Sequence, residues 1–384
     1  MWRIVILGVG LAAVTLFGFS LVNVSGGSDI STRAVIQAPA DSIDGFTRAL
    51  EPLDWQFPLN FGQHPDFQTE WWYYTGNLTA ETGEEFGFQF TIFRRAIAPT
   101  APDSPSEWRS NQIYMAHFTV SDLTNGQFFH EERYSRAGDG LAGATVDPVY
   151  RVWLEDWQVR ALNDEATLTR IIANAADFGV DLTLEQVKPP ALQGYRGLSP
   201  KSAEPGNASH YYTLSRLLTD GTITLGERTY TVTGLSWKDH EFSTSALGEG
   251  AQGWDWFALI FDDGTEMMVG KIRLVDGGRE PAFGGLFIFA DGSTQYLPSS
   301  DFTITPTDTW TSPHTGATYP SGWIIEVDSG EVQLTLTVTP AMRDQELHGS
   351  DIAYWEGAIR ITGDKTGVGY AELTGYVDTM QGRF

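Results

Sequence analysis

The sequence contains no cysteine, and it has few basic residues. The absence of cysteine excludes disulfides, thiolate metal ligands, a cysteine nucleophile and a lipid-modified cysteine anchor. The chain has 24 Lys and Arg against 49 Asp and Glu, which gives a formal net charge of -25. Nucleic-acid binding requires clustered cations that neutralise phosphates, and anionic lipid attracts the same residues. We therefore expect neither nucleic acid nor an anionic lipid surface as a partner.

Common catalytic and cofactor motifs are also missing. No GxSxG nucleophile elbow and no HExxH zinc motif occurs, and His240-Glu241 lacks the second histidine of the latter. Residues 138–143, GDGLAG, match GxGxxG but lie in a turn region without a strand-to-helix context, so we interpret them as a loop. Without CxxC or closely spaced histidine pairs, the sequence predicts neither a metal site nor a cofactor.

What the chain does contain is typical of β structure. It has 41 Gly, 18 Pro and 13% aromatic residues, and few long runs of helix formers. Residues 86–93 alternate apolar and polar, residues 113–120 are apolar and β-branched, and loops rich in Pro, Gly and Ser separate such segments. Short strands with frequent turns and no βαβ spacing predict an all-β chain of antiparallel barrels or sandwiches.

An internal repeat divides this β structure into two halves. Residues 70–93 and 253–272 share one pattern, in which a Trp-x-aromatic-aromatic start is followed by an apolar strand, an acidic Gly turn and a second strand. The halves also end alike, with YTVTGL at 230–235 and YAELTGY at 370–376. Duplication of one unit predicts two tandem domains, at 53–245 and 251–384. We expect the function inside one barrel or between the two.

The N-terminus carries an export signal or an anchor. Residues 4–22 are an unbroken apolar run after Arg3, with a length between that of a signal-peptide core and a minimal membrane span. Gly26 is an acceptable cleavage site, so residues 1–26 are either a cleaved signal peptide or a membrane anchor. Residues 27–52 show no sustained period and are expected to be a flexible tether. Both alternatives predict an extracytoplasmic protein, either secreted, periplasmic or anchored facing outward.

The densest polar cluster is SWKDHEFS at residues 236–243. On a strand, Trp237, Asp239 and Glu241 share one face, while Lys238 and His240 take the other. If the first face points into a barrel, burial raises the pKa of its carboxyl groups, which is what a general acid needs. The alternative is a strand end whose charges only cap loops.

Further candidates lie on other aromatic strands. Asp255 alternates with two tryptophans, which favours a solvent-facing side chain. His117 is flanked by apolar residues, as core histidines often are. We consider the following residues candidates for ligand contact: Glu70, Trp71, His117, Tyr212, Trp237 and Trp254.

Four blocks of the sequence resemble the carotenoid 1,2-hydratase and AttH family. They are FPLNFGQHPDFQTEWWYYTGNL at 57–78, YYTLSRL at 211–217, GLSWKDHEFS at 234–243 and GWDWFALIFDDGTEMM at 253–268. The resemblance covers the chain from about residue 53 to its end. It implies two lipocalin-like β-barrel domains. Hydratases of this family add water to the terminal double bond of an acyclic carotenoid, whereas related exported proteins are called predicted hydrolases or accompany ABC transporters.

The resemblance implies a site that binds an apolar isoprenoid or lipid-like molecule. Protonation of an alkene creates a carbocation, so the catalytic candidates are Asp239 as acid and His240 or Glu241 as the group that orients Asp239 or the water. Rings of Trp237, Tyr212 and Trp254 would face the cation. No metal or redox cofactor is required. The enzyme would be a hydratase, or a related isomerase or cyclase. The alternative is a carrier without catalysis, or a partner of an ABC transporter, whose carboxylates are structural.

Overall fold

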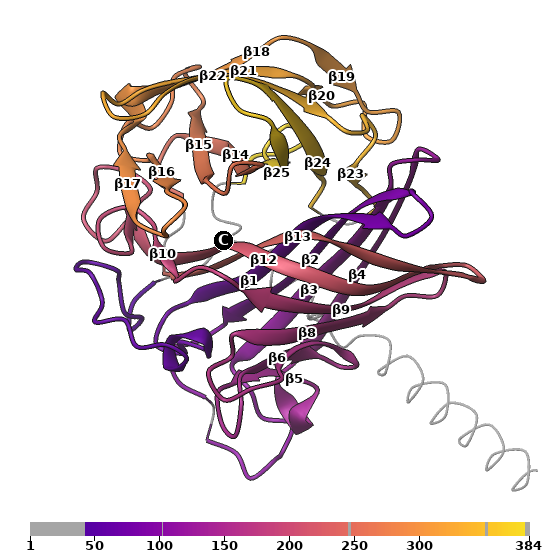
Figure 1. Ribbon diagram of the computed structural model, residues 1–384. Helices are drawn as coiled ribbons and strands as arrows, with labels where there is room; N and C mark the ends of the chain where they lie inside the picture. Colours follow the sequence, from indigo (N-terminus) through magenta and orange to yellow (C-terminus); the bar gives the residue numbers. More distant parts are fainter. Residues whose placement is uncertain (1–42, 102, 245–246, 350–351, 381–384) are drawn as a thin grey trace, which may run out of the picture.

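The structure, a computed structural model, describes residues 43–101, 103–244, 247–349 and 352–380. The predicted signal or anchor at 1–26 and most of the predicted tether lie outside the described residues. Two large antiparallel sheets, each curved into a barrel, make up the described chain, and the second barrel stacks on the first (Figure 1). This confirms the predicted all-β fold with two antiparallel barrels. No helix in the described part of the chain is long and apolar enough to cross a membrane.

The first sheet is built from the strands of the first half of the chain. Its order is β4-β3-β2-β1-β13-β12-β9-β8-β7-β6-β5, with β10 and β11 paired to β12. The strands are β1 (Thr69–Ala80), β2 (Glu85–Ala96), β3 (Gln112–Asp122), β4 (Gln127–Arg136), β5 (Ala142–Thr145), β6 (Arg151–Leu154), β7 (Trp157–Ala161), β8 (Leu168–Asn174), β9 (Phe178–Gln186), β10 (Ala191–Leu192), β11 (Leu198–Pro200), β12 (Ala208–Leu225) and β13 (Arg228–Ser243). Short 3₁₀ turns lie at η1 (Leu59–Phe61) and η2 (Gly138–Gly140).

The second sheet repeats this plan with fewer strands. Its order is β17-β16-β15-β14-β25-β24-β22-β21-β18, with β23 paired to β24. The strands are β14 (Ala251–Phe261), β15 (Glu266–Leu274), β16 (Gly285–Ile288), β17 (Thr294–Leu297), β18 (Phe302–Pro306), β21 (Trp323–Asp328), β22 (Gln333–Pro340), β23 (Glu346–Leu347), β24 (Tyr354–Gly363) and β25 (Gly367–Leu373). A separate ribbon pairs β19 (Thr309–Thr311) with β20 (Thr318–Pro320), and η3 (Ser299–Asp301) precedes β18.

The topology carries the repeat that the sequence predicts. In the first sheet the opening hairpin β1-β2 continues, through β1, into the last strand β13. In the second sheet the opening hairpin β14-β15 likewise continues, through β14, into the last strand β25. The paired sequence motifs therefore mark the strands at which each barrel brings its first and last strands together.

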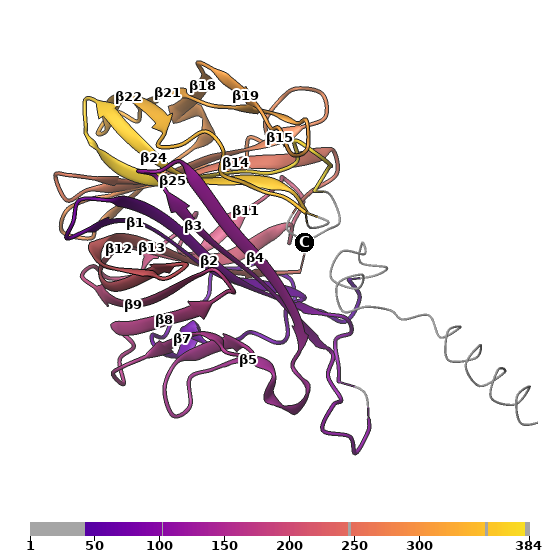
Figure 2. The same cartoon turned by 90° about the vertical axis from the view of Figure 1, so that its right-hand side faces the viewer.

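Both faces of these closing strands are buried. On β1, Trp72 and Tyr74 face the core of the first barrel, whereas Tyr73 belongs to a separate apolar cluster that it shares with Trp256 of β14. On β14, Phe257 faces the core of the second barrel. Figure 2 shows strands β14, β24 and β25 lying over β1 and β13. The barrels thus pack face to face through their closing strands.

A buried ion cluster fixes one side of this contact. Lys188, in the loop between β9 and β10, reaches the second barrel and donates to Glu266 Oε2 at 2.8 Å. Arg216 of β12 donates to Glu266 Oε1 at 2.5 Å. The side chain of Glu266 is fully buried. Because a buried carboxylate needs both charge and hydrogen-bond partners, this cluster sets how the two barrels dock.

A glycine permits close approach elsewhere in the same contact. A Cβ built on Gly87 of β2 would lie 2.9 Å from the hydroxyl of Tyr370 and 3.0 Å from Cβ of Ala358. A larger residue would therefore separate β2 from β24 and β25.

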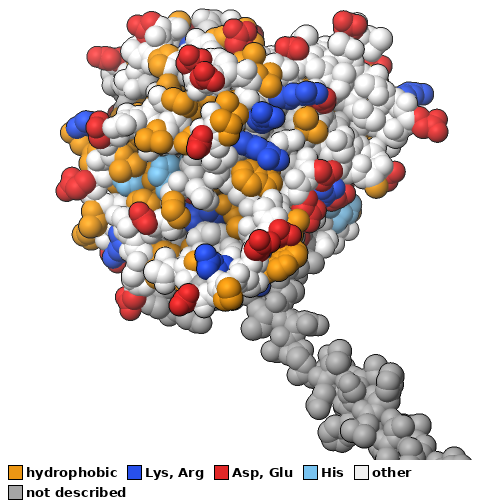
Figure 3. All heavy atoms as spheres, turned by 90° about the horizontal axis from the view of Figure 1, so that it is seen from below, with side chains coloured by type: hydrophobic (Ala, Val, Ile, Leu, Met, Phe, Trp, Pro, Cys, Tyr) orange, Lys and Arg blue, Asp and Glu red, His pale blue; other side chains and the backbone are white. Residues whose placement is uncertain are grey.

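The opposite face of the first barrel differs from this contact surface, because acidic, basic and hydrophobic side chains are interspersed there (Figure 3).

Candidate functional site

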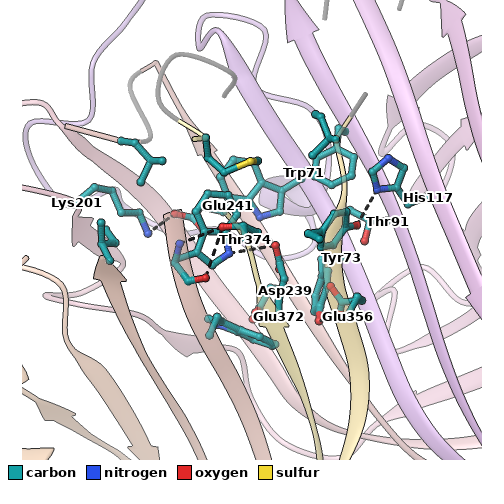
Figure 4. Close-up of a pocket in the computed structure, with 18 of the residues that line it drawn as sticks. Trp71, Tyr73, Thr91, His117, Lys201, Asp239, Glu241, Glu356, Glu372 and Thr374 are labelled. Carbon is teal, nitrogen blue, oxygen red and sulfur yellow. Dashed lines mark hydrogen bonds and ion pairs between the residues drawn. The ribbon is translucent and has the colours of Figure 1, made fainter. Parts of the chain in front are cut away.

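A cavity lies between the two barrels and is lined by residues of both. Its volume is about 90 Å³. The walls come from β1, β2, β3, β12 and β13 of the first barrel and from β14, β15, β24 and β25 of the second, with Lys201 near one end (Figure 4). The lining residues are Trp71, Tyr73, Thr91, Phe93, His117, Lys201, Tyr211, Asp239, Glu241, Leu247, Trp254, Trp256, Ile272, Phe283, Ile352, Tyr354, Glu356, Glu372, Thr374 and Met380.

Asp239 is the polar centre of the first-barrel wall. Its Oδ2 accepts a hydrogen bond from the Tyr211 hydroxyl at 2.8 Å. Its Oδ1 accepts from Thr213 Oγ1 at 2.5 Å and from Trp237 Nε1 at 2.9 Å. Burial raises the pKa of Asp239 to about 7, although these three hydrogen bonds act to lower the pKa, and Glu241 adds to the rise. Asp239 can therefore hold or release a proton near neutral pH.

Two further carboxyl groups, Glu356 and Glu372, form the second-barrel wall. They are directly opposite each other on β24 and β25. Glu356 Oε1 accepts from the Tyr73 hydroxyl at 2.7 Å, and Glu372 Oε1 accepts from Trp254 Nε1 at 3.0 Å. Burial raises the pKa of Glu356 well above its ordinary range and the pKa of Glu372 to about 8, and the charge of Glu372 adds to the rise at Glu356. The pair therefore retains protons at neutral pH.

Sequence analysis missed several site residues, namely Tyr73, Tyr211, Trp256, Lys201 and the two carboxyl groups of Glu356 and Glu372. Each of the two glutamates stands alone among apolar neighbours, in YWEGAI and YAELTGY. An isolated glutamate in an apolar strand was the available signal, since burial of such a carboxyl is costly without a functional or structural reason.

Glu241 differs from the other carboxyl groups because a cation neutralises it. Lys201 Nζ lies 2.5 Å from Glu241 Oε1, which also accepts from the Ser209 hydroxyl. The same ammonium lies over the rings of Tyr211 and Phe283, at 5.3 and 4.7 Å from their centroids. Glu241 is thus paired with a cation at the cavity wall.

Aromatic rings make up much of the remaining surface. Tyr73 and Trp256, from different barrels, meet edge to face with centroids 5.2 Å apart. Trp256 Nε1 donates to the Tyr211 hydroxyl at 3.3 Å, which extends the hydrogen-bond chain to Asp239. Trp71 and Trp254 also line the cavity. Such rings offer apolar contact and electron-rich faces to a ligand.

The sequence-derived candidates divide between the cavity and the interior of the first barrel. Asp239, Glu241, Trp71, Trp254 and His117 line the cavity. His117 is also a satisfied histidine, since its Nδ1 is 2.7 Å from the Tyr354 hydroxyl and its Nε2 is 2.9 Å from Glu132 Oε2. Trp237 is buried behind the wall and contacts the site through its hydrogen bond to Asp239.

His240, Tyr212 and Glu70 do not line the cavity. They meet inside the first barrel, where His240 Nε2 lies 2.8 Å from Glu70 Oε1 and His240 Nδ1 lies 3.0 Å from the Tyr212 hydroxyl. The reason is strand alternation, which sends His240 to the face of β13 opposite Asp239. His240 therefore cannot orient Asp239, and Tyr212 cannot face a ligand in the cavity. Burial lowers the pKa of His240 to about 3.

The face with Trp237, Asp239 and Glu241 points out of its own barrel toward the second barrel, so the condition that it points into the first-barrel interior is not met. The expectation of a solvent-facing Asp255 is wrong, because this side chain is fully buried. Both faces of β14 are covered, which explains why Asp255 is buried. Its carboxylate is paired with Arg273 at 3.0 Å and with Lys271 at 3.2 Å.

The described residues contain one group with metal-ligand geometry, inside the first barrel. Ligand atoms of His64, Glu70 and His240 all lie within 4.8 Å of one another. Arg94 Nε, however, donates to Glu70 Oε2 at 2.8 Å. Burial acts to raise the pKa of Glu70, but Arg94 and the two histidines outweigh burial and hold this pKa well below its ordinary range. The arginine already supplies the positive charge that a metal ion would bring, so this group is better suited to a structural role.

Two stacked antiparallel barrels with an acidic, aromatic cavity between them define a protein with two lipocalin-like domains. The sequence profile of the AttH-like family matches residues 48–376, and the chain therefore belongs to this family. No curated protein matches the chain significantly.

Solved structures agree with this assignment. The structure of a putative AttH from Nitrosomonas europaea is 34% identical in sequence, with a TM-score of 0.76, and the match covers 86% of this chain and 100% of that one. Kievitone hydratase from Nectria haematococca is 16% identical, with a TM-score of 0.65 and coverage of 88% of this chain and 98% of that chain. At that identity the second likeness extends to the fold alone.

Proposed function

We propose that the cavity between the barrels binds an apolar isoprenoid or lipid-like molecule and adds water to one of its C=C bonds, with Asp239 as general acid. The observation that carries this proposal is a buried carboxyl group at an aromatic cavity wall, with its pKa raised to about 7. A carboxylic acid that is protonated near neutral pH is what protonation of an alkene requires. Kievitone hydratase, which shares the fold, is named for a reaction of the same class.

The proposed chemistry balances with groups of this chain. The π bond takes the carboxyl proton of Asp239, which leaves a carbocation and a carboxylate. Rings of Tyr73, Trp254 and Trp256 surround the cation. A water molecule adds to the cation, and the Asp239 carboxylate takes one proton from the added water, which restores the acid. The sum is the addition of one water molecule across the double bond.

The volume of the cavity limits which part of a substrate it encloses. At about 90 Å³, it is smaller than the roughly 150 Å³ engineered cavity that binds benzene. We therefore propose that the reacting end of the molecule enters the cavity and that the remainder extends beyond it.

A carrier without catalysis is a second candidate, which one specific observation favours. Both oxygens of Asp239 already accept hydrogen bonds from Tyr211, Thr213 and Trp237. A structural carboxylate has the same arrangement. For this function an ABC transporter is the proposed partner.

The experiment that tests ligand binding is mass spectrometry of apolar molecules that copurify with the protein. Thr91, which is fully buried at the cavity wall, is replaced in the variant Thr91→Phe, which fills the cavity. The matched control is Thr79→Phe, at an exposed position of the neighbouring strand β1. We expect apolar molecules on the wild type and on Thr79→Phe, and their loss from Thr91→Phe. Retention by all three proteins would place the ligand elsewhere.

We also propose an extracytoplasmic location, which the apolar run at residues 4–22 supports. A reporter fused after Phe384 should be active only outside the cytoplasm. Cytoplasmic activity of this reporter would refute export.

A further inference from the structure

The cavity has an excess of acid that the proposed hydration does not use. Asp239, Glu356 and Glu372 line it together with Glu241. Lys201 is the one Lys or Arg among the lining residues that the structure describes, and it is paired with Glu241. Within the described part of the chain, no Lys, Arg or His makes an ion pair with the other three carboxyl groups. Three acids therefore face one small space without a basic partner.

The geometry of Glu356 and Glu372 adds an independent observation. Their Cα atoms are direct cross-strand partners, an arrangement that destabilises two like charges. Glu356 is fully buried, and its Oε2 has no hydrogen-bond partner among the described residues. Buried carboxyl oxygens are rarely left unsatisfied, so this oxygen at the cavity wall indicates a missing hydrogen-bond partner.

We infer that the cavity accepts a protonated amine, with its ammonium group between Glu356 and Glu372 and its apolar body against the aromatic walls. An ammonium group supplies both the positive charge and the N–H donors that Glu356 Oε2 lacks. The Tyr73 hydroxyl and Trp254 Nε1 donate to the two glutamates, so both aromatic side chains lie next to the proposed position of the ammonium group.

The arrangement favours an organic cation over a metal ion. A metal ion needs several ligand atoms gathered around one point. Among the described residues, the group that meets this condition is His64, Glu70 and His240 inside the first barrel, and it includes none of the cavity acids. The cavity carboxyl groups lie on two walls among aromatic rings, which suits a ligand with an apolar body.

Binding of a cation should change the protonation of the pair. Burial raises the pKa of both glutamates, so the empty cavity holds protons that an ammonium group would displace. The other titratable groups that face the pair are Tyr73, Tyr354 and Tyr370, together with Asp239, Glu241, Lys201 and His117 at the cavity walls. Burial raises the pKa of the three tyrosines well above their ordinary value, so they stay neutral while the carboxyl groups titrate.

The test compares two ligands that differ in one group, geranylamine and geraniol, by titration calorimetry on the full chain at pH 7. Geranylamine should bind about tenfold tighter than geraniol. A desolvated ammonium group beside aromatic rings and carboxyl groups contributes an amount of this order to binding. Glu356→Gln and Glu372→Gln should each remove most of this preference. Glu326→Gln, which removes one exposed charge from the same barrel, should keep it.

A second measurement uses the wild type alone and does not depend on how the variants fold. Titration with geranylamine in two buffers of different ionisation enthalpy should report proton release, whereas geraniol should release none. Equal affinity of the two ligands, or amine binding without proton release, would overturn the inference, as would failure of geranylamine to bind.

The inference rests on the proposed cavity as a ligand site but not on hydration. Equal binding of amine and alcohol would leave the hydratase proposal intact and refute only the preference for a cation. If the protein prefers the amine but hydrates no alkene, the preference for a cation stands and only the hydratase proposal is refuted. The same electrostatics would stabilise the carbocation of the proposed reaction.

Discussion

The Tyr73 hydroxyl of the first barrel donates a hydrogen bond to Glu356 of the second barrel, at 2.7 Å. Both side chains are buried and both line the cavity. The acid pair is therefore positioned by a residue from the other barrel, and the site is complete only when the barrels are stacked. Neither barrel alone contains the cavity.

This relationship predicts the effect of Tyr73→Phe. The variant keeps the ring and removes the one side-chain donor that the described residues offer to the Glu356 carboxyl group, which then loses this partner. We expect a loss of about 1–3 kcal/mol in the free energy of unfolding, measured by urea denaturation. Tyr195→Phe removes a hydroxyl from a side chain that is 69% exposed and should change stability little. Equal effects of the two substitutions would contradict the role of Tyr73.

The ion cluster around Glu266 predicts a larger effect at Lys188. Lys188→Met leaves Glu266 with Arg216 and Ser215 but breaks a buried ion pair between the barrels. Loss of one partner that leaves a buried charge uncompensated costs roughly 3–5 kcal/mol, and because Arg216 still pairs with Glu266 we expect the lower end, about 3 kcal/mol. Arg343→Met, at an exposed pair with Asp308 in the second barrel, should cost less than about 1 kcal/mol. A small effect at Lys188 would show that the barrels dock without this cluster.

The raised pKa of Asp239 predicts a pH dependence of stability. Burial raises this pKa from its ordinary value of 3.8 to about 7 in the folded protein, so the folded state holds a proton that the unfolded chain releases. This contribution is complete below about pH 4 and is lost as the pH rises to about 7. Asp239→Asn should therefore gain stability relative to the wild type across that window, by on the order of 4 kcal/mol. Thermal unfolding of both proteins from pH 4 to 8 measures the difference, and a constant difference would refute the raised pKa.

The position of His240 predicts a structural role. His240→Gln disturbs the hydrogen bonds to Glu70 and Tyr212 inside the first barrel but leaves the cavity wall unchanged. We expect a loss of about 1–3 kcal/mol in stability, with ligand affinity equal to that of the wild type. Normal stability combined with lost turnover would instead support a catalytic histidine.

The fold could be predicted from the sequence because its signals are local. The hairpin pattern at residues 70–93 and 253–272 recurs because both segments occupy the same place in their barrels, where β1 and β14 join the closing strands. Alternation on residues 237–241 also separates the two faces of β13 correctly. The pattern cannot tell which face points into a barrel, since both faces are buried in a protein of two stacked barrels.

The acid pair could not be predicted for a related reason. Glu356 and Glu372 are 16 positions apart in the sequence, and their approach depends on the register of β24 and β25. Likewise, burial of Asp255 depends on Lys271 and Arg273 of the neighbouring strand. Cross-strand relationships of this kind are set by packing of the whole sheet rather than by local pattern.

The central claim is that Asp239 supplies the proton for addition of water. The most direct test compares wild type and Asp239→Asn on an acyclic isoprenoid identified from the copurified molecules, with separate measurements of ligand affinity and of hydration rate. The substitution keeps size and polarity but removes the transferable proton. Hydration should fall by on the order of 100-fold to 10,000-fold while affinity is retained. Equal rates for the two proteins would contradict the assignment of Asp239 as the acid, and binding without turnover in both would establish a carrier.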